Sequence, residues 1–464
     1  MTVALPEPYF LHGEPKQVLV FFGGTGHLFT QKILPALYFL QKEGRLEKAV
    51  LIAIGRRFST QTEYQNFVFQ NLKQHLPTAK DSSLLKLAKS FHYLSGSLED
   101  AQTYRELNRL LPPLPQEIIF YLSTLPSLYQ KVVLSLKEHV LSAVAPRSQK
   151  IALEKPFGRD EESFAQLEST LKTVFSEEEI YYVDHYLGKE TVLNLIILKA
   201  ENLFLERLLS GEFVQQVHFV VSEKEGVGER GTFYQETGAI KDMVQNHMLQ
   251  LLTLLAVDIP TLCEEDRKEC EQFVVTMNRR RTHLLEEVAL PPAKEIKLGQ
   301  YQSYQAEVNQ LHSRVETLVQ MPLYLQNPRW SGVPFWLSTG KKLAQKTSFI
   351  EVTFNSLTET PNRLLIEIQP EEKIDLIVNV KKFGRELRSV PAKLNLCLSG
   401  SFQAATPQAY QKIIHDILLG DHTIFPNSSF IRNSWKIIDK LLALIDKENL
   451  TPKIYPDHSP LPVF

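Results

Sequence analysis

The chain has 464 residues, of which 43% are hydrophobic and 22% charged, a balance typical of a folded globular protein. Its formal net charge of −2 argues against a nucleic-acid partner, and no apolar run reaches the roughly 18 residues that a membrane-spanning helix needs. The N-terminus lacks the pattern of a secretory signal, and the spacing of the three cysteines matches neither a metal site nor a disulfide framework. We therefore expect a cytoplasmic enzyme of two or three domains that binds no metal.

The first part of the chain alternates short apolar runs with longer amphipathic stretches. Runs typical of buried strands cover residues 17–22, 49–54, 117–122, 150–153 and 180–183. Helical patterns cover residues 28–44, 60–74, 126–140 and 161–175. This alternation predicts parallel strands joined by right-handed crossovers. We expect a Rossmann-like, doubly wound α/β domain over residues 1–183, with its ligand beyond the carboxyl ends of the strands.

A glycine-rich turn, GGTGHL, follows the first predicted strand and opens the first predicted helix. Glycine lets the backbone approach a pyrophosphate, and a helix N-terminus offers free N–H groups and a partial positive charge. The pattern differs from G-x-G-x-x-G, and glycines at such a turn can also be purely structural. Its position between strand and helix favours a nucleotide site. The predicted cofactor contacts are Gly23, Gly24, Thr25, Gly26, His27 and Leu28.

The end of the second predicted strand indicates which nucleotide binds. A site for NAD places an acidic residue there, to accept a hydrogen bond from the ribose 2′-hydroxyl. The sequence instead reads AIGRRFST, with Arg56 and Arg57 and no acid. Guanidinium groups suit the additional 2′-phosphate of NADP. The pattern favours NADP over NAD, although a solvated turn with two arginines is the alternative.

After residue 190 the rhythm of the sequence changes. Helical patterns cover residues 189–209 and 237–256. Strand-like runs, which are not each followed by a helix, cover residues 214–223, 348–355, 362–370 and 373–382. We therefore expect an α+β domain over residues 184–464, in which a large, mainly antiparallel sheet packs on helices.

Two polar clusters stand out in this second part, DHYLGKE at 184–190 and DMVQNH at 242–247. The first combines a possible helix cap, Asp184, with an imidazole, a phenol and an ammonium group that could bind an anion. The second holds His247, and imidazole is the commonest general base at neutral pH. Asp242 and His247 are five residues apart, which on an ideal α-helix is about 140° round the axis, so Asp242 would be a poor partner. A buried structural histidine is the alternative.

These clusters, with EKPFG at 154–158 and NPRWSGVPFWLSTGK at 327–341, make the chain similar to the glucose-6-phosphate dehydrogenase family. The four blocks occur in that family's order and at similar spacing. The resemblance implies oxidation of glucose 6-phosphate at C1 to 6-phospho-glucono-1,5-lactone, with hydride transfer to NADP, the first step of the oxidative pentose phosphate pathway. It also implies a homodimer or homotetramer.

The resemblance implies a role for each matching residue. His247 would be the catalytic base and Asp184 the carboxylate that orients it, while Asp242 would bind a sugar hydroxyl. The implied phosphate ligands are His185, Tyr186 and Lys189. Lys155 would contact both the sugar and the nicotinamide end of the cofactor. The further implied substrate contacts are Glu223, Lys341, Lys346 and Gln369.

Several positions depart from the family pattern. His27 replaces an aspartate of the glycine-rich turn, Gln235 replaces an aspartate in RGTFYQETG, and Ser338 and Glu367 stand where arginines are usual. Glu367 makes a second, structural NADP site of the animal kind unexpected. These departures motivate two alternatives, a diverged non-catalytic sensor of a phosphosugar or nucleotide, and a dehydrogenase of another hexose phosphate.

Overall fold

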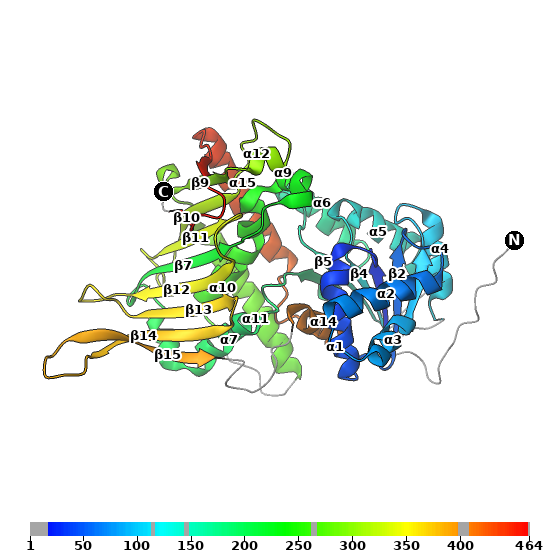
Figure 1. Cartoon of the computed structure of the whole chain (residues 1–464), viewed down its shortest axis with the longest axis horizontal. Coiled ribbons are helices and arrows are strands. Elements are labelled where there is room, and N and C mark those ends of the chain that lie inside the picture. Colours follow the sequence, from blue (N-terminus) through cyan, green and yellow to red (C-terminus); the bar gives the residue numbers. More distant parts are fainter. Residues whose placement is uncertain (1–16, 113–116, 143–147, 261–266, 398–407, 463–464) are drawn as a thin grey trace. The chain divides into compact units, whose positions relative to one another are not determined.

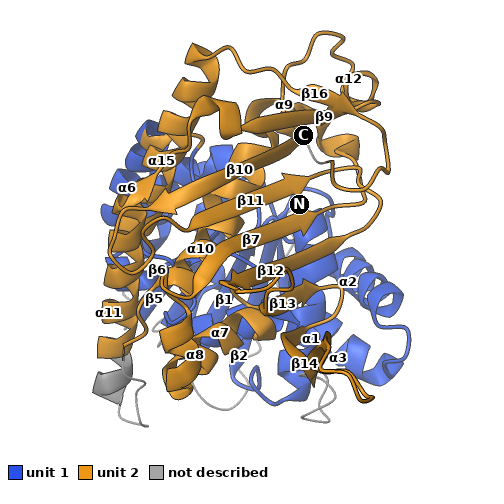
Figure 2. Cartoon of the chain, turned by 90° about the vertical axis from the view of Figure 1, so that its left-hand side faces the viewer, with its two compact units in different colours: residues 1–158, 162–185, 408–428 blue, residues 159–161, 186–407, 429–464 orange. Residues whose placement is uncertain are grey.

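The computed structural model describes residues 17–462, apart from 113–116, 143–147, 261–266 and 398–407 (Figure 1). The described chain divides into two compact units, coloured in Figure 2. The first comprises residues up to 158 with 162–185 and 408–428, and the second comprises 159–161, 186–407 and 429–464. The sequence analysis placed all of 184–464 in one domain, whereas 408–428 belongs to the first unit. Lys150 Nζ holds it there by donating to the carbonyl of Ile417 at 2.8 Å.

The first unit is built on a six-stranded sheet with the strand order β3-β2-β1-β4-β5-β6. All its strand pairs are parallel, and the apolar runs form its buried centre. The strands are β1 (Gln17–Phe22), β2 (Ala49–Gly55), β3 (Phe91–Ser95), β4 (Glu117–Leu122), β5 (Ser148–Glu154) and β6 (Ile180–Val183). The doubly wound α/β prediction is confirmed. The sequence analysis missed β3, whose burial is broken by exposed positions because it forms the edge of the sheet.

This unit also contains helices, and each of them except α14 lies between two of its strands. They are η1 (Phe29–Ile33), α1 (Leu34–Lys42), α2 (Gln61–His75), α3 (Asp81–Ser90), α4 (Ala101–Leu110), η2 (Pro126–Leu128), α5 (Tyr129–Leu136), η3 (Lys137–Leu141), α6 (Glu161–Lys172), η4 (Glu177–Glu179) and α14 (Ala409–Leu419). Helix α2 begins with a capping box, in which Thr60 Oγ1 accepts from Glu63 N and a Glu63 carboxylate oxygen accepts from Thr60 N. Local capping by Thr60 therefore starts this helix at Gln61, shortly after the arginine pair.

The second unit contains a ten-stranded sheet with the order β15-β14-β13-β12-β7-β11-β10-β9-β16, and β8 pairs with β10. The pairs β7–β11 and β9–β16 are parallel and the others are antiparallel. The strands are β7 (Val214–Ser222), β8 (Val288–Ala289), β9 (Lys297–Tyr301), β10 (Leu318–Leu325), β11 (Pro334–Gly340), β12 (Thr347–Phe354), β13 (Arg363–Gln369), β14 (Lys373–Lys381), β15 (Ser389–Cys397) and β16 (Lys453–Tyr455). The expected large, mainly antiparallel sheet is confirmed.

The helices of the second unit are α7 (Glu190–Glu201), α8 (Leu203–Leu208), η5 (Gly228–Arg230), α9 (Gly231–Ala239), η6 (Ile240–Met248), α10 (Leu249–Ala256), α11 (Arg267–Glu286), η7 (Ala293–Glu295), α12 (Tyr304–Glu307) and α15 (Ser428–Lys447). Segment η6 is a π-helix, with backbone bonds from residue i to i+5. Among the described residues, we find no helix with the length and apolarity to cross a membrane.

Candidate active site

The glycine-rich turn of the first unit is shaped by close backbone contacts. Gly23 has a φ of +87°, and a side chain there would meet the carbonyl oxygen of Ser123. A side chain at Gly24 would meet the side chain of Ala53. The N–H groups of both glycines donate to the carbonyl of Ile54, at 3.1 and 2.9 Å. The turn therefore has a fixed shape that only glycine permits, with exposed His27 at the start of the following helix.

The two arginines directly follow β2 and are exposed. The guanidinium of Arg57 lies over the rings of Phe58 and Phe67, 5.4 and 5.2 Å from their centroids. Cation–π contacts of this kind steady the guanidinium plane while its N–H edge can still bind an anion. The geometry suits a phosphate group at this end of the sheet.

Strand β5 ends in a buried carboxylate, Glu154, directly before Lys155 and its cis peptide bond to Pro156. Tyr121 Oη donates to Glu154 at 2.6 Å and Tyr410 Oη donates at 3.3 Å. Burial raises the pKa of Glu154 to about 7, although the two tyrosine hydrogen bonds and the Lys155 charge oppose this shift. Glu154 is not among the predicted site residues, although a carboxylate at the end of a buried parallel strand is a signal visible in the sequence.

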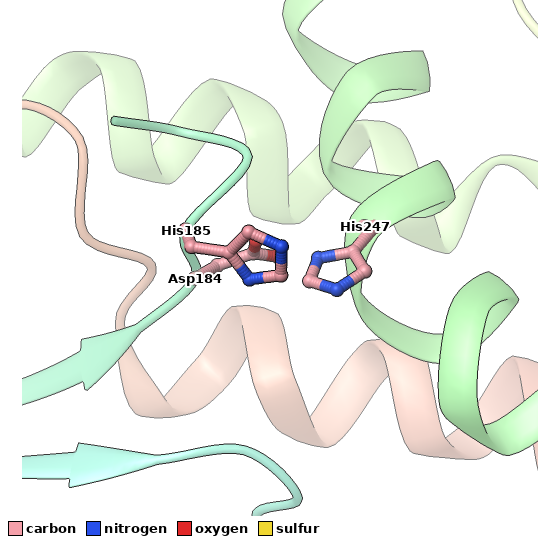
Figure 3. Close-up of side chains that lie close together, drawn as sticks. All are labelled: Asp184, His185 and His247. Atoms are coloured by element: carbon pink, nitrogen blue, oxygen red, sulfur yellow. The ribbon is translucent and has the colours of Figure 1, made fainter. Parts of the chain in front are cut away.

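The DHYLGKE block supplies residues to both units. Asp184 and His185 follow β6 in the first unit. Figure 3 draws their side chains. Asp184 is buried, and the His185 ring stacks on that of Tyr410 with the centroids 6.4 Å apart. Tyr410 therefore contacts both His185 and Glu154, and it comes from the late segment that joins this unit.

Tyr186 and Lys189 begin the second unit. The Tyr186 hydroxyl lies 3.2 Å from Ser348 Oγ, and Ser348 is the strand partner of Gln369 at the end of β13. The predicted contacts Tyr186 and Gln369 therefore both lie beside Ser348.

The helical pattern predicted from residue 189 begins as a helix at Glu190, because Lys189 has an extended backbone with φ −81° and ψ 133°. The Lys189 ammonium lies 3.5 Å from the Glu372 carboxylate. That carboxylate also accepts from the backbone N–H and the hydroxyl of Thr191, both at 3.1 Å. Glu372, which is not among the predicted site residues, thus caps the N-terminal turn of α7.

Two further predicted residues of the second unit, Glu223 and Asp242, lie at the ammonium group of a third, Lys341. Lys341, directly after β11, pairs with the carboxylate of Glu223 and lies 3.6 Å from a carboxylate oxygen of Asp242. Its Nζ also lies over the ring of Tyr234, 5.1 Å from the centroid. Lys346, by contrast, is exposed between β11 and β12.

His247 is buried and projects from the π-helical segment η6 (Figure 3). Its ring lies against that of Tyr186, with the centroids 4.4 Å apart. The α-helical geometry assumed for Asp242 and His247 does not apply, because this segment is a π-helix and residues five apart lie on the same side of it. The Lys341 ammonium, which the sequence argument did not consider, is what engages Asp242.

Three of the departures from the family pattern, Gln235, Ser338 and Glu367, take part in contacts within the second unit. Gln235 donates to the hydroxyls of Tyr304 and Ser313, both at 3.0 Å, and Ser338 Oγ lies 2.8 Å from His218 Nε2. Glu367 pairs with Lys373 at 3.1 Å. These substitutions are absorbed by packing within the second unit.

Comparisons with known proteins cover nearly the whole chain. Residues 20–194 match the family model of the glucose-6-phosphate dehydrogenase NAD binding domain, and residues 196–463 match that of the C-terminal domain. The chain is 32% identical to glucose-6-phosphate 1-dehydrogenase of Bacillus subtilis (strain 168), covering 92% of this chain and 91% of that protein. It is also 32% identical to the enzyme of the same name from Mycolicibacterium smegmatis, covering 96% and 94%.

Solved structures give the same result. The chain superposes with a TM-score of 0.86 on a glucose-6-phosphate dehydrogenase in complex with its substrate glucose-6-phosphate, at 30% identity over 97% of this chain and 96% of that one. The TM-score is 0.84 for the glucose-6-phosphate 1-dehydrogenase from Mycobacterium avium, at 26% identity and the same coverage.

Proposed function

The chain belongs to the glucose-6-phosphate dehydrogenase family, and we propose that it uses NADP as the hydride acceptor and His247 as the general base. Its activity is the oxidation of glucose 6-phosphate at C1 to 6-phospho-glucono-1,5-lactone. We further propose a cytoplasmic homodimer or homotetramer, in which residues 1–183 bind the nucleotide and residues 184–464 bind the sugar phosphate and form the subunit contacts.

The single observation that carries the proposed sugar site is the cluster around Lys341. Glu223 and Asp242 come from two other segments, yet both carboxylates lie at this ammonium. Carboxylates accept hydrogen bonds from sugar hydroxyls and an ammonium donates to their oxygens. The cluster therefore offers donors and acceptors of the kind that a hexose ring with several hydroxyls requires.

In the proposed chemistry, neutral His247 accepts the proton of the C1 hydroxyl. As the proton leaves oxygen, the hydride leaves C1 and the C1–O bond becomes the lactone carbonyl. We propose Asp184 as the carboxylate that orients this imidazole, a role that selects the tautomer and stabilises the imidazolium. Tyr186 supports the same role by packing its ring against the imidazole.

The phosphate of the substrate would be bound by His185, Tyr186 and Lys189, with Lys346 and Gln369 as further contacts. Imidazole, phenol and ammonium groups all donate hydrogen bonds to phosphate oxygens. The Ser348–Gln369 pairing beside the Tyr186 hydroxyl supports this grouping.

The cofactor would be held by the turn residues 23–28, by Arg56 and Arg57, and by Lys155 at its nicotinamide end. When bound, its nicotinamide ring supplies the hydride acceptor. The turn suits a pyrophosphate, because Gly23 and Gly24 fix a tight turn at a helix start, and the partial positive charge of a helix N-terminus favours an anion. The exposed guanidinium groups after β2 support a preference for the 2′-phosphate of NADP.

An absorbance assay at 340 nm tests the proposal, with NADP or NAD and a panel of hexose phosphates and free glucose. We expect reduction of NADP with glucose 6-phosphate and much slower reduction with NAD. Faster turnover of another hexose phosphate would make that compound, and not glucose 6-phosphate, the assigned substrate. Binding by calorimetry without any change in absorbance would instead favour a sensor.

A further inference from the structure

We propose that Glu316 is a positioning residue that holds the π-helical segment η6, and with it Asp242 and His247, in place relative to Lys341. This inference rests on the proposed role of His247. Glu316 lies just before β10 and matches none of the residues assigned to the site above.

The first contact is made at the N-terminus of η6. The Glu316 side-chain Oε1 accepts from the N–H of Ile240 at 3.0 Å, and its backbone carbonyl accepts from the N–H of Ala239 at 3.0 Å. N–H groups at a helix start lack partners within the helix, and a carboxylate there also interacts favourably with the helix dipole. Glu316 therefore fixes the beginning of the segment that carries both Asp242 and His247.

The chain turns into η6 at Gly238, and this turn depends on Glu316. Gly238 has a φ of +60° and a ψ of −176°, which lies outside helical geometry. A side chain at this position would collide with both carboxylate oxygens of Glu316. The entry into η6 and the Glu316 side chain are thus packed against each other, so neither can move alone.

The residue after Glu316 holds the other side of the cluster. The carbonyl of Thr317 accepts from the N–H of Lys341 at 3.0 Å. Tyr455 Oη donates to the carbonyl of Lys341 at 2.6 Å and lies 3.0 Å from Thr317 Oγ1. Two consecutive residues, 316 and 317, therefore set the position of η6 and of Lys341. Their spacing determines where Asp242 meets the Lys341 ammonium.

The charged surroundings of Glu316 determine which substitution is conservative. Desolvation raises the pKa of Glu316 to about 7, opposed by its backbone hydrogen bonds and by Lys241. The other titratable groups that interact with it are Tyr234 and Tyr304, each with a pKa raised chiefly by burial. Glutamine retains the side-chain oxygen that accepts from Ile240 and carries no charge, so Glu316→Gln preserves the contact that Glu316→Ala removes.

The test compares Glu316→Ala and Glu316→Gln in the full-length enzyme, with glucose 6-phosphate and NADP varied separately and the melting temperature recorded. Because small misplacements of reacting groups are costly, we expect Glu316→Ala to lower kcat about 10- to 100-fold. We expect the kcat of Glu316→Gln to stay within about threefold of the wild-type kcat, since only the side-chain oxygen that accepts from Ile240 is needed. The KM for NADP should not change in either variant.

Glu307→Gln is the matched control, because Glu307 accepts from the N–H of Gly228 at 2.5 Å and from Tyr301 Oη at 2.9 Å, which are groups outside η6. It should leave kcat unchanged. Wild-type kcat in Glu316→Ala, or equal losses in Glu316→Ala and Glu316→Gln, would overturn the inference. If Glu316→Ala does not fold, Glu316→Asp takes its place, since the shorter side chain withdraws the acceptor. If His247→Asn is inactive while Glu316→Ala is fully active, the positioning role of Glu316 is rejected and the proposed base is kept. If His247→Asn is active, the proposed role of His247 as the base is rejected.

Discussion

The rings of Tyr186 and His247 lie face to face at an incline of 30°, with their centroids 4.4 Å apart. The phenol of Tyr186 is itself held at its hydroxyl by Ser348. One side chain therefore connects the group proposed to bind phosphate with the imidazole proposed to accept the proton. A ring packed in this way has little rotational freedom, which keeps one nitrogen directed at a fixed point.

His247→Asn should lower kcat by about 10²- to 10⁴-fold, the usual contribution of a general base. The KM for glucose 6-phosphate should change little, because asparagine leaves the phosphate and hydroxyl contacts in place. Steady-state kinetics measure both constants, and exposed His312→Asn is the control. A loss of only a fewfold in kcat would assign proton transfer to another group.

Lys189→Ala should raise the KM for glucose 6-phosphate by at least about tenfold, which corresponds to about 1.4 kcal/mol of binding free energy. The physical reason is the loss of an ammonium beside a doubly charged phosphate, so kcat should fall less than kcat/KM. Exposed Lys294→Ala is the matched control. Equal use of glucose and glucose 6-phosphate by the wild type would contradict the phosphate assignment.

Replacing Arg56 and Arg57 together by alanine should raise the KM for NADP by about 10- to 100-fold, since charge-assisted bonds to the 2′-phosphate are lost. The KM for NAD should stay the same, because that cofactor has no 2′-phosphate. Exposed Arg105→Ala should affect neither constant. A wild type that prefers NAD would show that these arginines have no part in the choice of cofactor.

Glu154→Gln should change how stability depends on pH. The folded pKa of Glu154, about 7, lies above its ordinary value of 4.5, so its favourable contribution to stability is complete below pH 4.5 and lost as pH rises through 7. The free energy of unfolding of Glu154→Gln should therefore rise relative to that of the wild type between pH 5 and pH 8. This relative increase should approach about 3 kcal/mol at most. Denaturant titrations across this range measure it.

Exposed Glu99→Gln serves as the control for Glu154→Gln and should show the same pH dependence as the wild type. A constant difference between Glu154→Gln and the wild type from pH 5 to pH 8 would mean that Glu154 does not titrate in this range.

Much of the fold was predictable because its signals are local. The buried parallel strands appear as continuous apolar runs, which is how the sequence analysis found β1, β2, β4, β5 and β6. Strand β3 lies at the edge of its sheet and is broken by exposed positions, so no comparable run marks it. Long helices such as α11 and α15 were not predicted, and the helical pattern predicted over residues 189–209 divides into α7 and α8.

The sequence by itself determined the doubly wound α/β domain, the family, and the residue types of the site, since apolar periodicity, glycine turns and short motifs are carried by neighbouring residues. Only the tertiary structure decided that η6 is a π-helix, that Asp242 meets Lys341, that Tyr186 packs on His247, and that residues 408–428 join the first unit. These features depend on backbone and side-chain contacts between residues far apart in the chain, such as Glu316 with Ile240, and local sequence patterns do not encode such contacts.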